Sequence, residues 1–325
     1  MQYKETIIEP TERGIGRQTT QHILMVRPNQ FGYNPETAAS NAFQVKDDTA
    51  TDEIAAKAIE EFDAFVAKLR GHGINVIVAQ DLAKPHTPDA VFPNNWVTFH
   101  ENGTVMLYPM LSATRRLERQ PNVLETVYGN FQHKRVIDLS PYESRGQFLE
   151  GTGSMILDRV NRLVYACISP RTEPVLLDEF CEWAGYEKVE FRAVDENGLP
   201  IYHTNVMMAM GDKFAIICMA TVADKRDKAK LLKRFAVTGK KWIDISIAQM
   251  KAFAGNMLQV ENDKGQTFLI MSEQAYRSLR PAQITAIEKY TTILHSPIYT
   301  IEKYGGGSAR CMMAEIFLPV VIDNR

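Results

Sequence analysis

The stretch WVTFHENGTVMLY, Trp96–Tyr108, has the pattern of a β-hairpin: an apolar run, a short polar turn and a second apolar run. Runs rich in β-branched and aromatic residues around an Asn-Gly turn are typical of paired antiparallel strands. The same pattern returns in Met155–Leu157 with Leu163–Ile168, in Val206–Met210 with Phe214–Met219, in Met257–Val260 with Thr267–Met271, and in Met312–Val321 with the N-terminal segment Ile23–Val26. The last pairing would close the chain on itself.

Helical patterns and single strands lie between these hairpins. Apolar residues at helical spacing predict helices over Asp52–Leu69, Val175–Trp183, Asp224–Phe235 and Ile247–Phe253. Further strands are predicted at Ile74–Val78, Val136–Leu139, Val189–Val194, Trp242–Ile245 and Ile298–Ile301. The unit is therefore hairpin, helix, strand, repeated about every 54 residues.

A unit that recurs at a fixed period indicates radial repetition around a centre, because a closed ring removes free sheet edges. We therefore expect an α/β fold in which five ββαβ modules form a pseudo-symmetric propeller. Residues 1–325 would form a single catalytic domain, with about residues 1–20 as an N-terminal extension. An ordinary two-domain α/β chain is the competing interpretation.

A polar residue opens the first strand of each hairpin. These residues are Asn95, Glu150, His203, Asn256 and Cys311, and they follow one another at intervals of 53 to 55 residues. Equivalent positions of a ring face its axis, so a thiol, an imidazole and a carboxylate would meet there. Each residue could instead have a purely structural role, in a turn, at a helix cap or as a hydrogen-bonded residue of the core.

Cys311 and His203 stand out from the other residues of their types. Cys311 follows Gly305–Gly307, a run that allows close backbone approach to a ligand. Cys167 and Cys218 lie in apolar strands and Cys181 on an apolar helix face, where cysteine behaves as a small hydrophobic residue. Of the seven histidines, only His203 occupies the repeating position.

The bulk composition excludes several classes of protein. Lys and Arg number 37 against 39 Asp and Glu, so no excess of positive charge predicts nucleic acid or an anionic membrane as partner. No apolar run reaches the length of a membrane span or of a signal peptide core, so we expect a cytoplasmic protein. No metal-ligand spacing or phosphate loop is present, so neither metal nor cofactor is expected. The sequence is compatible with a homo-oligomer.

Several short motifs, in this order, resemble the pentein superfamily of guanidino-group modifying enzymes. That superfamily includes arginine deiminases, dimethylarginine dimethylaminohydrolases and amidinotransferases. The motifs, which extend over most of the chain, are HILMVRP (22–28), PDAVFPNNW (88–96), TRRLE (114–118), LEGTGS (149–154), SPRTE (169–173), YHTNV (202–206) and GGGSARCM (305–312). The fold that this resemblance implies is a propeller of five ββαβ modules, in agreement with the period.

The resemblance also implies roles for the residues. Cys311 would attack the planar carbon of a small amino-acid substrate, His203 would act as general acid and base, and Glu150 would orient His203. Arg115 and Arg171 would bind the substrate α-carboxylate, with Arg116 as a weaker substitute for Arg115. A resonance-deactivated carbon needs a strong nucleophile such as a thiolate, and a leaving amine needs a proton, so these residue types suit the reaction.

The sequence departs from the family where carboxylates hold a guanidinium. Asp89 is retained, but Asn94, Asn95 and Asn205 stand in this chain near or at the other acidic positions. A guanidinium is cationic and carries donors only, whereas a ureido group offers donors and an acceptor, which asparagine can match. We therefore expect a hydrolase of citrulline, close to citrulline-utilisation hydrolases. The alternatives are an arginine deiminase, a dimethylargininase-like hydrolase, an amidinotransferase and an inactive binding scaffold.

Overall fold

The computed structural model describes residues 16–38, 41 and 43–321. In this part of the chain the strands form five three-stranded sheets, ordered β15-β1-β2, β3-β4-β5, β6-β7-β8, β11-β10-β9 and β12-β13-β14. Their bounds are β1 His22–Arg27, β2 Asn75–Gln80, β3 Val97–Phe99, β4 Thr104–Leu107, β5 Arg135–Asp138, β6 Ile156–Asp158, β7 Leu163–Cys167, β8 Glu187–Phe191, β9 Met208–Met210, β10 Phe214–Ile217, β11 Lys241–Asp244, β12 Leu258–Glu261, β13 Thr267–Ser272, β14 Thr292–Ser296 and β15 Ala314–Glu315.

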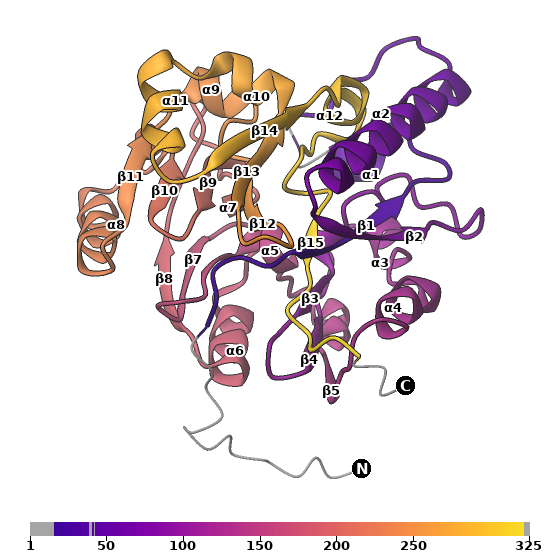
Figure 1. The fold of residues 1–325 in the computed structure, drawn as a ribbon, viewed down its shortest axis with the longest axis horizontal. Coiled ribbons are helices and arrows are strands. Elements are labelled where there is room, and N and C mark those ends of the chain that lie inside the picture. Colours follow the sequence, from indigo (N-terminus) through magenta and orange to yellow (C-terminus); the bar gives the residue numbers. More distant parts are fainter. Residues whose placement is uncertain (1–15, 39–40, 42, 322–325) are drawn as a thin grey trace.

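Every sheet has the same internal order. Its middle strand pairs antiparallel with one neighbour and parallel with the other, as a hairpin followed by a crossover requires. The five sheets surround a common centre (Figure 1). The predicted α/β propeller of five modules is therefore confirmed.

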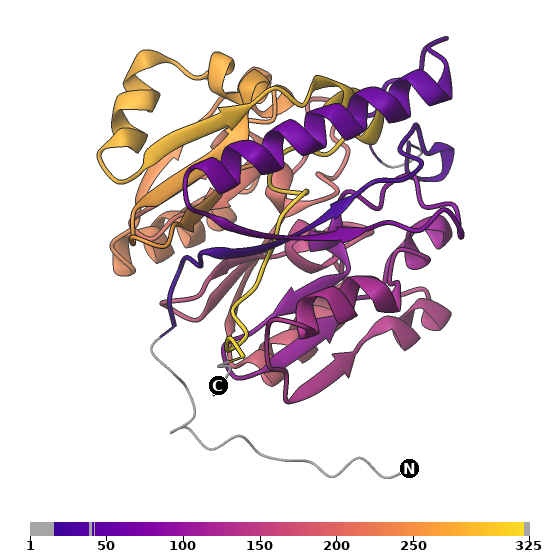
Figure 2. The ribbon, with the colours of Figure 1, turned by 45° about the vertical axis from the view of Figure 1, so that its right-hand side comes forward.

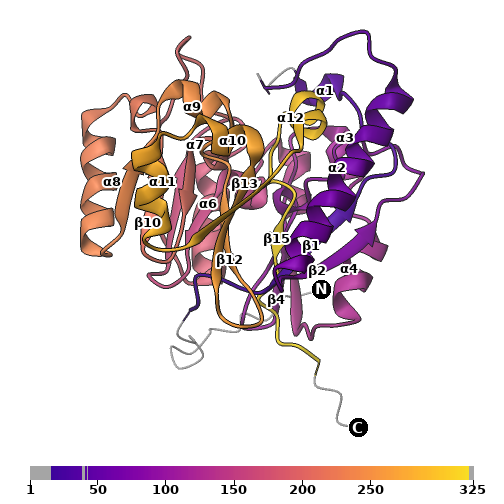
Figure 3. The same ribbon diagram turned by 45° about the horizontal axis from the view of Figure 1, so that its top comes forward.

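Helices connect and cover the sheets. They are α1 Pro35–Ala38, α2 Thr51–Gly71, α3 Ala113–Arg116, α4 Pro121–Tyr128, α5 Gly151–Ser154, α6 Pro174–Ala184, α7 Thr204–Met207, α8 Lys225–Val237, α9 Ile247–Lys251, α10 Glu273–Ser278, α11 Pro281–Glu288 and α12 Tyr299–Gly305, with 3₁₀ turns η2 Pro93–Asn95, η3 Ser140–Arg145 and η4 Met219–Thr221. The helices α2, α8 and α11 lie on the outside of the molecule and the strands lie within (Figure 3).

The apolar pattern of each helix explains this arrangement. In α2 the buried side chains recur at helical spacing and form one stripe, which faces the sheet of β1 and β2. The members of this stripe are Ile54, Ala58, Phe62, Phe65, Val66 and Leu69. Figure 2 shows α2 running along the outside of the molecule, next to the segment that contains α12.

The hairpin strands are buried on both faces. Every residue of β7 and β10 is buried, because neighbouring sheets and the outer helices cover them from both sides. This explains why these strands are continuous apolar runs rather than alternating ones.

The two ends of the described chain meet in one sheet. Ile23 pairs with Glu315 and Leu24 with Ala314, so β1 and β15 are antiparallel neighbours (Figure 1). The prediction that Met312–Val321 would pair with Ile23–Val26 is confirmed, although β15 is shorter than predicted. The closed ring directs the start of each hairpin towards one central region.

Two predicted strands are wrong in detail. Ile298–Ile301 was expected to be a strand, but it belongs to the start of α12, and the fifth module uses Thr292–Ser296 instead. Two carboxylate oxygens of Glu61 accept hydrogen bonds from the N–H groups of Thr300 and Ile301, which stabilises a helix start there. The strand predicted from Val206 begins at Met208, because Thr204–Met207 forms the helical turn α7.

The predicted N-terminal extension, about residues 1–20, lies outside the described residues up to residue 15. Residues beyond that point contact the ring. The side-chain amide of Gln18 donates to Leu157 O at 2.9 Å, and the hydroxyl of Thr20 donates to Ile316 O at 2.8 Å.

Candidate active site

The five residues that open the hairpins are all buried at the centre of the ring. Asn95 ends η2, Glu150 precedes α5, His203 precedes α7, and Asn256 precedes β12. Three of the five, Asn95, His203 and Cys311, line one pocket. The equivalent positions of the modules therefore bring a thiol and an imidazole into one cavity.

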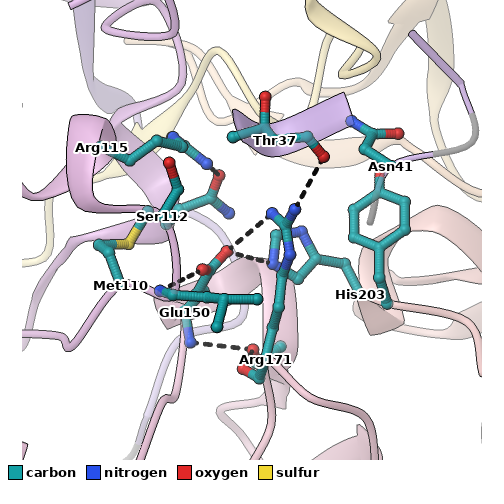
Figure 4. Close-up of polar contacts among 12 residues, drawn as sticks. Thr37, Asn41, Met110, Ser112, Arg115, Glu150, Arg171 and His203 are labelled. Carbon is teal, nitrogen blue, oxygen red and sulfur yellow. Dashed lines mark hydrogen bonds and ion pairs between the residues drawn. The ribbon is translucent and has the colours of Figure 1, made fainter. Parts of the chain in front are cut away.

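Glu150 and His203 form a hydrogen-bonded pair. Nε2 of His203 lies 2.7 Å from Oε2 of Glu150, which also receives Arg171 at 3.2 Å, and Oε1 accepts from the N–H of Leu111 at 2.9 Å. Figure 4 shows the guanidinium of Arg171 between Glu150 and the backbone oxygen of Thr37. The carboxylate is thus fixed from three sides.

The glycines after Glu150 allow this close packing. A Cβ atom at Gly153 would clash with Nδ2 of Asn95 and would lie 2.8 Å from the ring of His203. Gly151 adopts a φ of +45°, a conformation that side chains disfavour. The Gly-Thr-Gly sequence therefore lets two modules approach the imidazole closely.

The surroundings determine which member of this pair is charged at neutral pH. Burial raises the pKa of Glu150, but Arg171, the hydrogen bond from His203 and Arg115 outweigh burial and bring the pKa below its usual range. Burial lowers the pKa of His203 to about 4, and Glu150 offsets only part of that effect. At neutral pH the carboxylate is therefore ionised and the imidazole neutral. Nε2 carries the hydrogen that Glu150 accepts, which leaves Nδ1 as the basic nitrogen.

Cys311 follows Gly305–Gly307, the glycine run at which α12 ends. Gly306 has a φ of +63°, and a Cβ at Gly305 or Gly307 would lie within 2.9 Å of the Phe92 ring, so the run fits the pocket wall only as glycine. Two side-chain amides point at the sulfur: Nδ2 of Asn205 at 3.3 Å and Nδ2 of Asn256 at 3.2 Å. Cys311 is 6% exposed and lines the same pocket as His203.

The two predicted carboxylate-binding arginines both line the pocket but differ in their partners. Arg115 donates twice to Glu118, at 2.8 and 2.9 Å, and its third nitrogen donates to Oδ1 of Asn95 at 2.8 Å. Arg171 contacts Glu150 and stacks over the ring of Tyr202. Arg116 donates to backbone oxygens of Met110 and Leu111 instead.

The predicted polar residues of the substrate site are divided between the pocket and its supports. Asp89 lines the pocket; its Oδ2 accepts from Asn34 and its Oδ1 has no hydrogen-bond partner among the described residues. Asn95 also lines the pocket, and its Nδ2 likewise has no partner there. Asn94 instead donates to Thr152 at 3.3 Å and supports the turn behind Asn95.

Sequence reasoning missed several residues of the pocket wall. Thr37 and Asn41 come from the segment after β1, and Asn41 donates to the backbone oxygen of Gly306 at 3.2 Å. Tyr202 donates to the same oxygen at 3.0 Å. Tyr202 could have been found as the neighbour of His203, whereas nothing in the sequence around residues 37–41 marks a site.

Two kinds of feature are absent from the described residues. No group of three or more His, Cys, Asp or Glu side chains in residues 16–38, 41 and 43–321 could hold a metal ion. Over the same residues, no helix combines the length and apolar character that crossing a membrane demands.

The chain is similar in fold to solved structures of AgrE, of ArgZ and of a dimethylarginine dimethylaminohydrolase. Unliganded AgrE is 21% identical with a TM-score of 0.70; the match covers 93% of this chain and 40% of that chain, so this chain spans less than half of AgrE. The N-terminal domain of ArgZ bound to product, described as an arginine dihydrolase from cyanobacteria, is 18% identical with a TM-score of 0.70, and the match covers 93% and 99% of the two chains. A dimethylarginine dimethylaminohydrolase adduct with S-methyl-L-thiocitrulline is 15% identical with a TM-score of 0.62, covering 92% and 100%.

The sequence itself identifies the family. No curated protein matched the chain. The family described as N,N dimethylarginine dimethylhydrolase, eukaryotic, matches residues 27–318. Since this range includes almost all of the described ring, the resemblance predicted from the motifs is confirmed. The chain belongs to the N,N dimethylarginine dimethylhydrolase family, within the pentein superfamily, and is a hydrolase of carbon–nitrogen bonds other than peptide bonds.

Proposed function

We propose that the protein hydrolyses the ureido group of citrulline to ornithine, carbon dioxide and ammonia, with Cys311 as nucleophile. The proposal combines the family's cysteine-dependent chemistry on guanidino-type groups with a pocket whose polar groups suit a neutral substrate.

One observation carries the choice of substrate: the orientation of the Asn95 amide. Its Oδ1 accepts from Arg115 at 2.8 Å, so the amide presents Nδ2, a donor, to the pocket. A guanidinium has donors only and would face this donor unfavourably, whereas a ureido oxygen would accept from it. A buried donor left without a partner costs free energy, so this position favours a substrate with a carbonyl oxygen.

The buried Asp89 suits a ureido group in its protonated form. Burial raises the pKa of this carboxyl above its usual range, and the nearby Arg115 offsets that only in part. A protonated Asp89 is neutral and can donate or accept, which matches the N–H groups and oxygen of a ureido group without an unpaired buried charge.

In the first step Cys311 attacks the ureido carbon and a covalent bond forms between sulfur and carbon. We propose that Nδ1 of His203 takes the thiol proton and passes it to the terminal ureido nitrogen, since a neutral amine leaves far more easily than an amide anion. The bond between the carbon and this nitrogen breaks, ammonia leaves, and the carbonyl carbon, still bonded to the δ-nitrogen, stays on the sulfur. Glu150, bound to Nε2 at 2.7 Å, stabilises the transient imidazolium.

In the second step water attacks the same carbon and His203 Nδ1 accepts its proton. The carbon–sulfur bond breaks, the proton on His203 returns to the sulfur, and the carbamic acid released on the δ-nitrogen decomposes to ornithine and carbon dioxide. Overall, citrulline and one water yield ornithine, carbon dioxide and ammonia, so no oxidant or cofactor is required.

Arg115 and Arg171 take different roles in this proposal. Because Arg115 is held by Glu118 and Asn95, we assign it to fixing the Asn95 amide rather than to the α-carboxylate. Arg171, whose guanidinium lines the pocket beside Thr37, is the proposed partner of the α-carboxylate.

Arginine hydrolysis is the second candidate, and Asp89 is the observation that favours it. An ionised Asp89 would pair with a guanidinium, and a structural neighbour is described as an arginine dihydrolase. A steady-state comparison of citrulline, arginine, methylated arginines and agmatine, with ornithine and ammonia measured as products, separates the candidates. We expect the highest kcat/KM with citrulline and no turnover by Cys311→Ala. A higher value with arginine would overturn the choice of substrate.

A further inference from the structure

Asn256 opens the fourth hairpin and has no role in the two reaction steps proposed above. It is 1% exposed, and all of its amide hydrogen-bonding groups are engaged. Oδ1 accepts from the backbone N–H of Arg310 at 3.0 Å, while Nδ2 donates to Asn205 O at 3.0 Å and to the sulfur of Cys311 at 3.2 Å.

These partners fix the direction of the amide. If the amide were turned over, its oxygen would face the oxygen of Asn205 and its NH₂ group would face the N–H of Arg310. Both contacts would be repulsive, so the donor must point at the sulfur. Asn205, from the third module, adds a second donor at 3.3 Å.

Positive charges near the sulfur are paired with carboxylates. Arg310 donates to Glu315 at 2.8 Å, Arg115 to Glu118, and Arg171 to Glu150. Asp89, Tyr202 and the neutral His203 are the other titratable residues that line the pocket beside Cys311. A ureido group brings no positive charge to the sulfur, so we expect neutral donors to assist His203 in stabilising the developing thiolate.

We propose that Asn256 and Asn205 form a donor pair for the thiolate of Cys311, with Asn256 as a catalytic residue in direct contact with the reacting sulfur. The proposal rests on the nucleophilic role of Cys311 given above. Two donors aimed at sulfur stabilise its anion more than its thiol, because hydrogen bonds to a charged acceptor are the stronger ones. The two amides thus give the thiolate the stabilisation that the positive charge of a guanidinium substrate would otherwise give.

The test measures the thiolate in the full chain without substrate, from its ultraviolet absorbance against pH and from the rate of alkylation by iodoacetamide. The same measurements on Cys311→Ala isolate the signal of this residue. The background is low near neutral pH, because burial raises the pKa of Cys167 to about 12 and the pKa values of Cys181 and Cys218 to about 11.

Asn256→Asp keeps the shape of the side chain and its bond from the Arg310 N–H but removes both donors. We expect the midpoint of thiolate formation to rise by about one pH unit or more, with alkylation at neutral pH about tenfold slower. Asn205→Ala should shift the midpoint in the same direction and keeps the proposal testable if the first variant does not fold.

Asn262→Asp is the matched control. Asn262 is a buried amide at the far end of the same hairpin; its Oδ1 accepts from Lys264 and Gln266 N–H groups, and its Nδ2 donates to His72 O at 3.0 Å. It should leave the thiolate midpoint unchanged. An unchanged midpoint in folded Asn256→Asp and Asn205→Ala would overturn the proposal. Because no substrate is present, this result is independent of whether citrulline is the substrate.

Discussion

Asn95 and an aspartate would fill the same volume but present different hydrogen-bonding groups to a substrate. Here the oxygen of the amide is taken by Arg115, so the nitrogen faces the pocket. An aspartate would pair with Arg115 and turn a second acceptor towards the substrate. In the proposed function, the preference for citrulline over arginine thus rests on the amide nitrogen of Asn95.

Asn95→Asp should lower kcat/KM for citrulline by roughly tenfold to a hundredfold, the effect of replacing one buried donor by an acceptor. Activity on arginine should fall less or rise. Steady-state kinetics on both substrates measure the change.

Asn102→Asp is the matched control for that substitution. It adds the same charge in the same module, but at the exposed turn between β3 and β4, and Asp retains the oxygen that accepts from Thr104 N–H. Equal losses of kcat/KM for citrulline in Asn95→Asp and Asn102→Asp would contradict the role assigned to Asn95.

Sequence reasoning reached most residues of this site but not their orientations. The recurrence of Asn95, Glu150, His203, Asn256 and Cys311 indicated which side chains would meet. That Asn205 points at the sulfur and that Arg115 holds Asn95 depend on contacts between modules, which no local pattern contains. The same holds for Asn41, which reaches the glycine turn from a segment without any motif.

Helix α12 shows how a distant residue decides the structure of an element. Its first residues alternate between polar and apolar, a pattern typical of a strand, but Glu61 of α2 accepts hydrogen bonds from Thr300 and Ile301 N–H at 2.8 and 3.0 Å. Hydrogen-bond partners for these N–H groups and a negative charge at a helix N-terminus both stabilise a helix. Strands and helices with clear periodicity, such as α2, were predictable; this helix was not.

Glu61→Ala should lower the free energy of unfolding by about 1–2 kcal/mol, the usual effect of removing a helix cap. Urea unfolding of the full chain measures it. Glu60→Ala, at the exposed neighbouring position of α2, serves as control and should change stability little. An equal loss of unfolding free energy in Glu60→Ala would contradict the capping of α12 by Glu61, because the loss would then come from α2 itself.

Glu302, also in α12, is buried and accepts from the hydroxyl of Ser308 at 2.6 Å, which ties the helix to the cysteine turn. Burial raises its pKa from 4.5 to about 7, opposed in part by hydrogen bonds from Ser272 and Ser308. The folded state therefore holds this proton more tightly than the unfolded state. The protonated carboxyl of Glu302 contributes its whole share of the free energy of unfolding below about pH 4.5. This contribution is lost as the pH rises through about 7.

Glu302→Gln mimics the protonated form and should escape this loss. Relative to the wild type, the variant should gain up to about 3 kcal/mol of unfolding free energy between about pH 5 and about pH 8. Urea unfolding at the two pH values measures the gain, with the exposed Glu288→Gln as control. A difference between variant and wild type that does not change with pH would contradict the buried, protonated state.

The whole ring was predictable because its modules repeat. Each hairpin carries its own turn and apolar runs, and the fixed period relates one module to the next. The closure by β1 and β15 followed from the same pattern, since the first and last strands each lacked a partner. Closure matters for function: Cys311 comes from the last module and His203 from the third, and only a ring places both on one pocket.

The central claim is that a thiol at the axis of this ring carries the ureido carbon of citrulline. Citrulline labelled at that carbon, mixed with the full chain and quenched in acid during turnover, tests the claim most directly. We predict label on the peptide that contains Cys311, its later release as carbon dioxide together with ornithine, and no labelling of Cys311→Ala. Release of labelled carbon dioxide without label on that peptide, or turnover by Cys311→Ala, would contradict it.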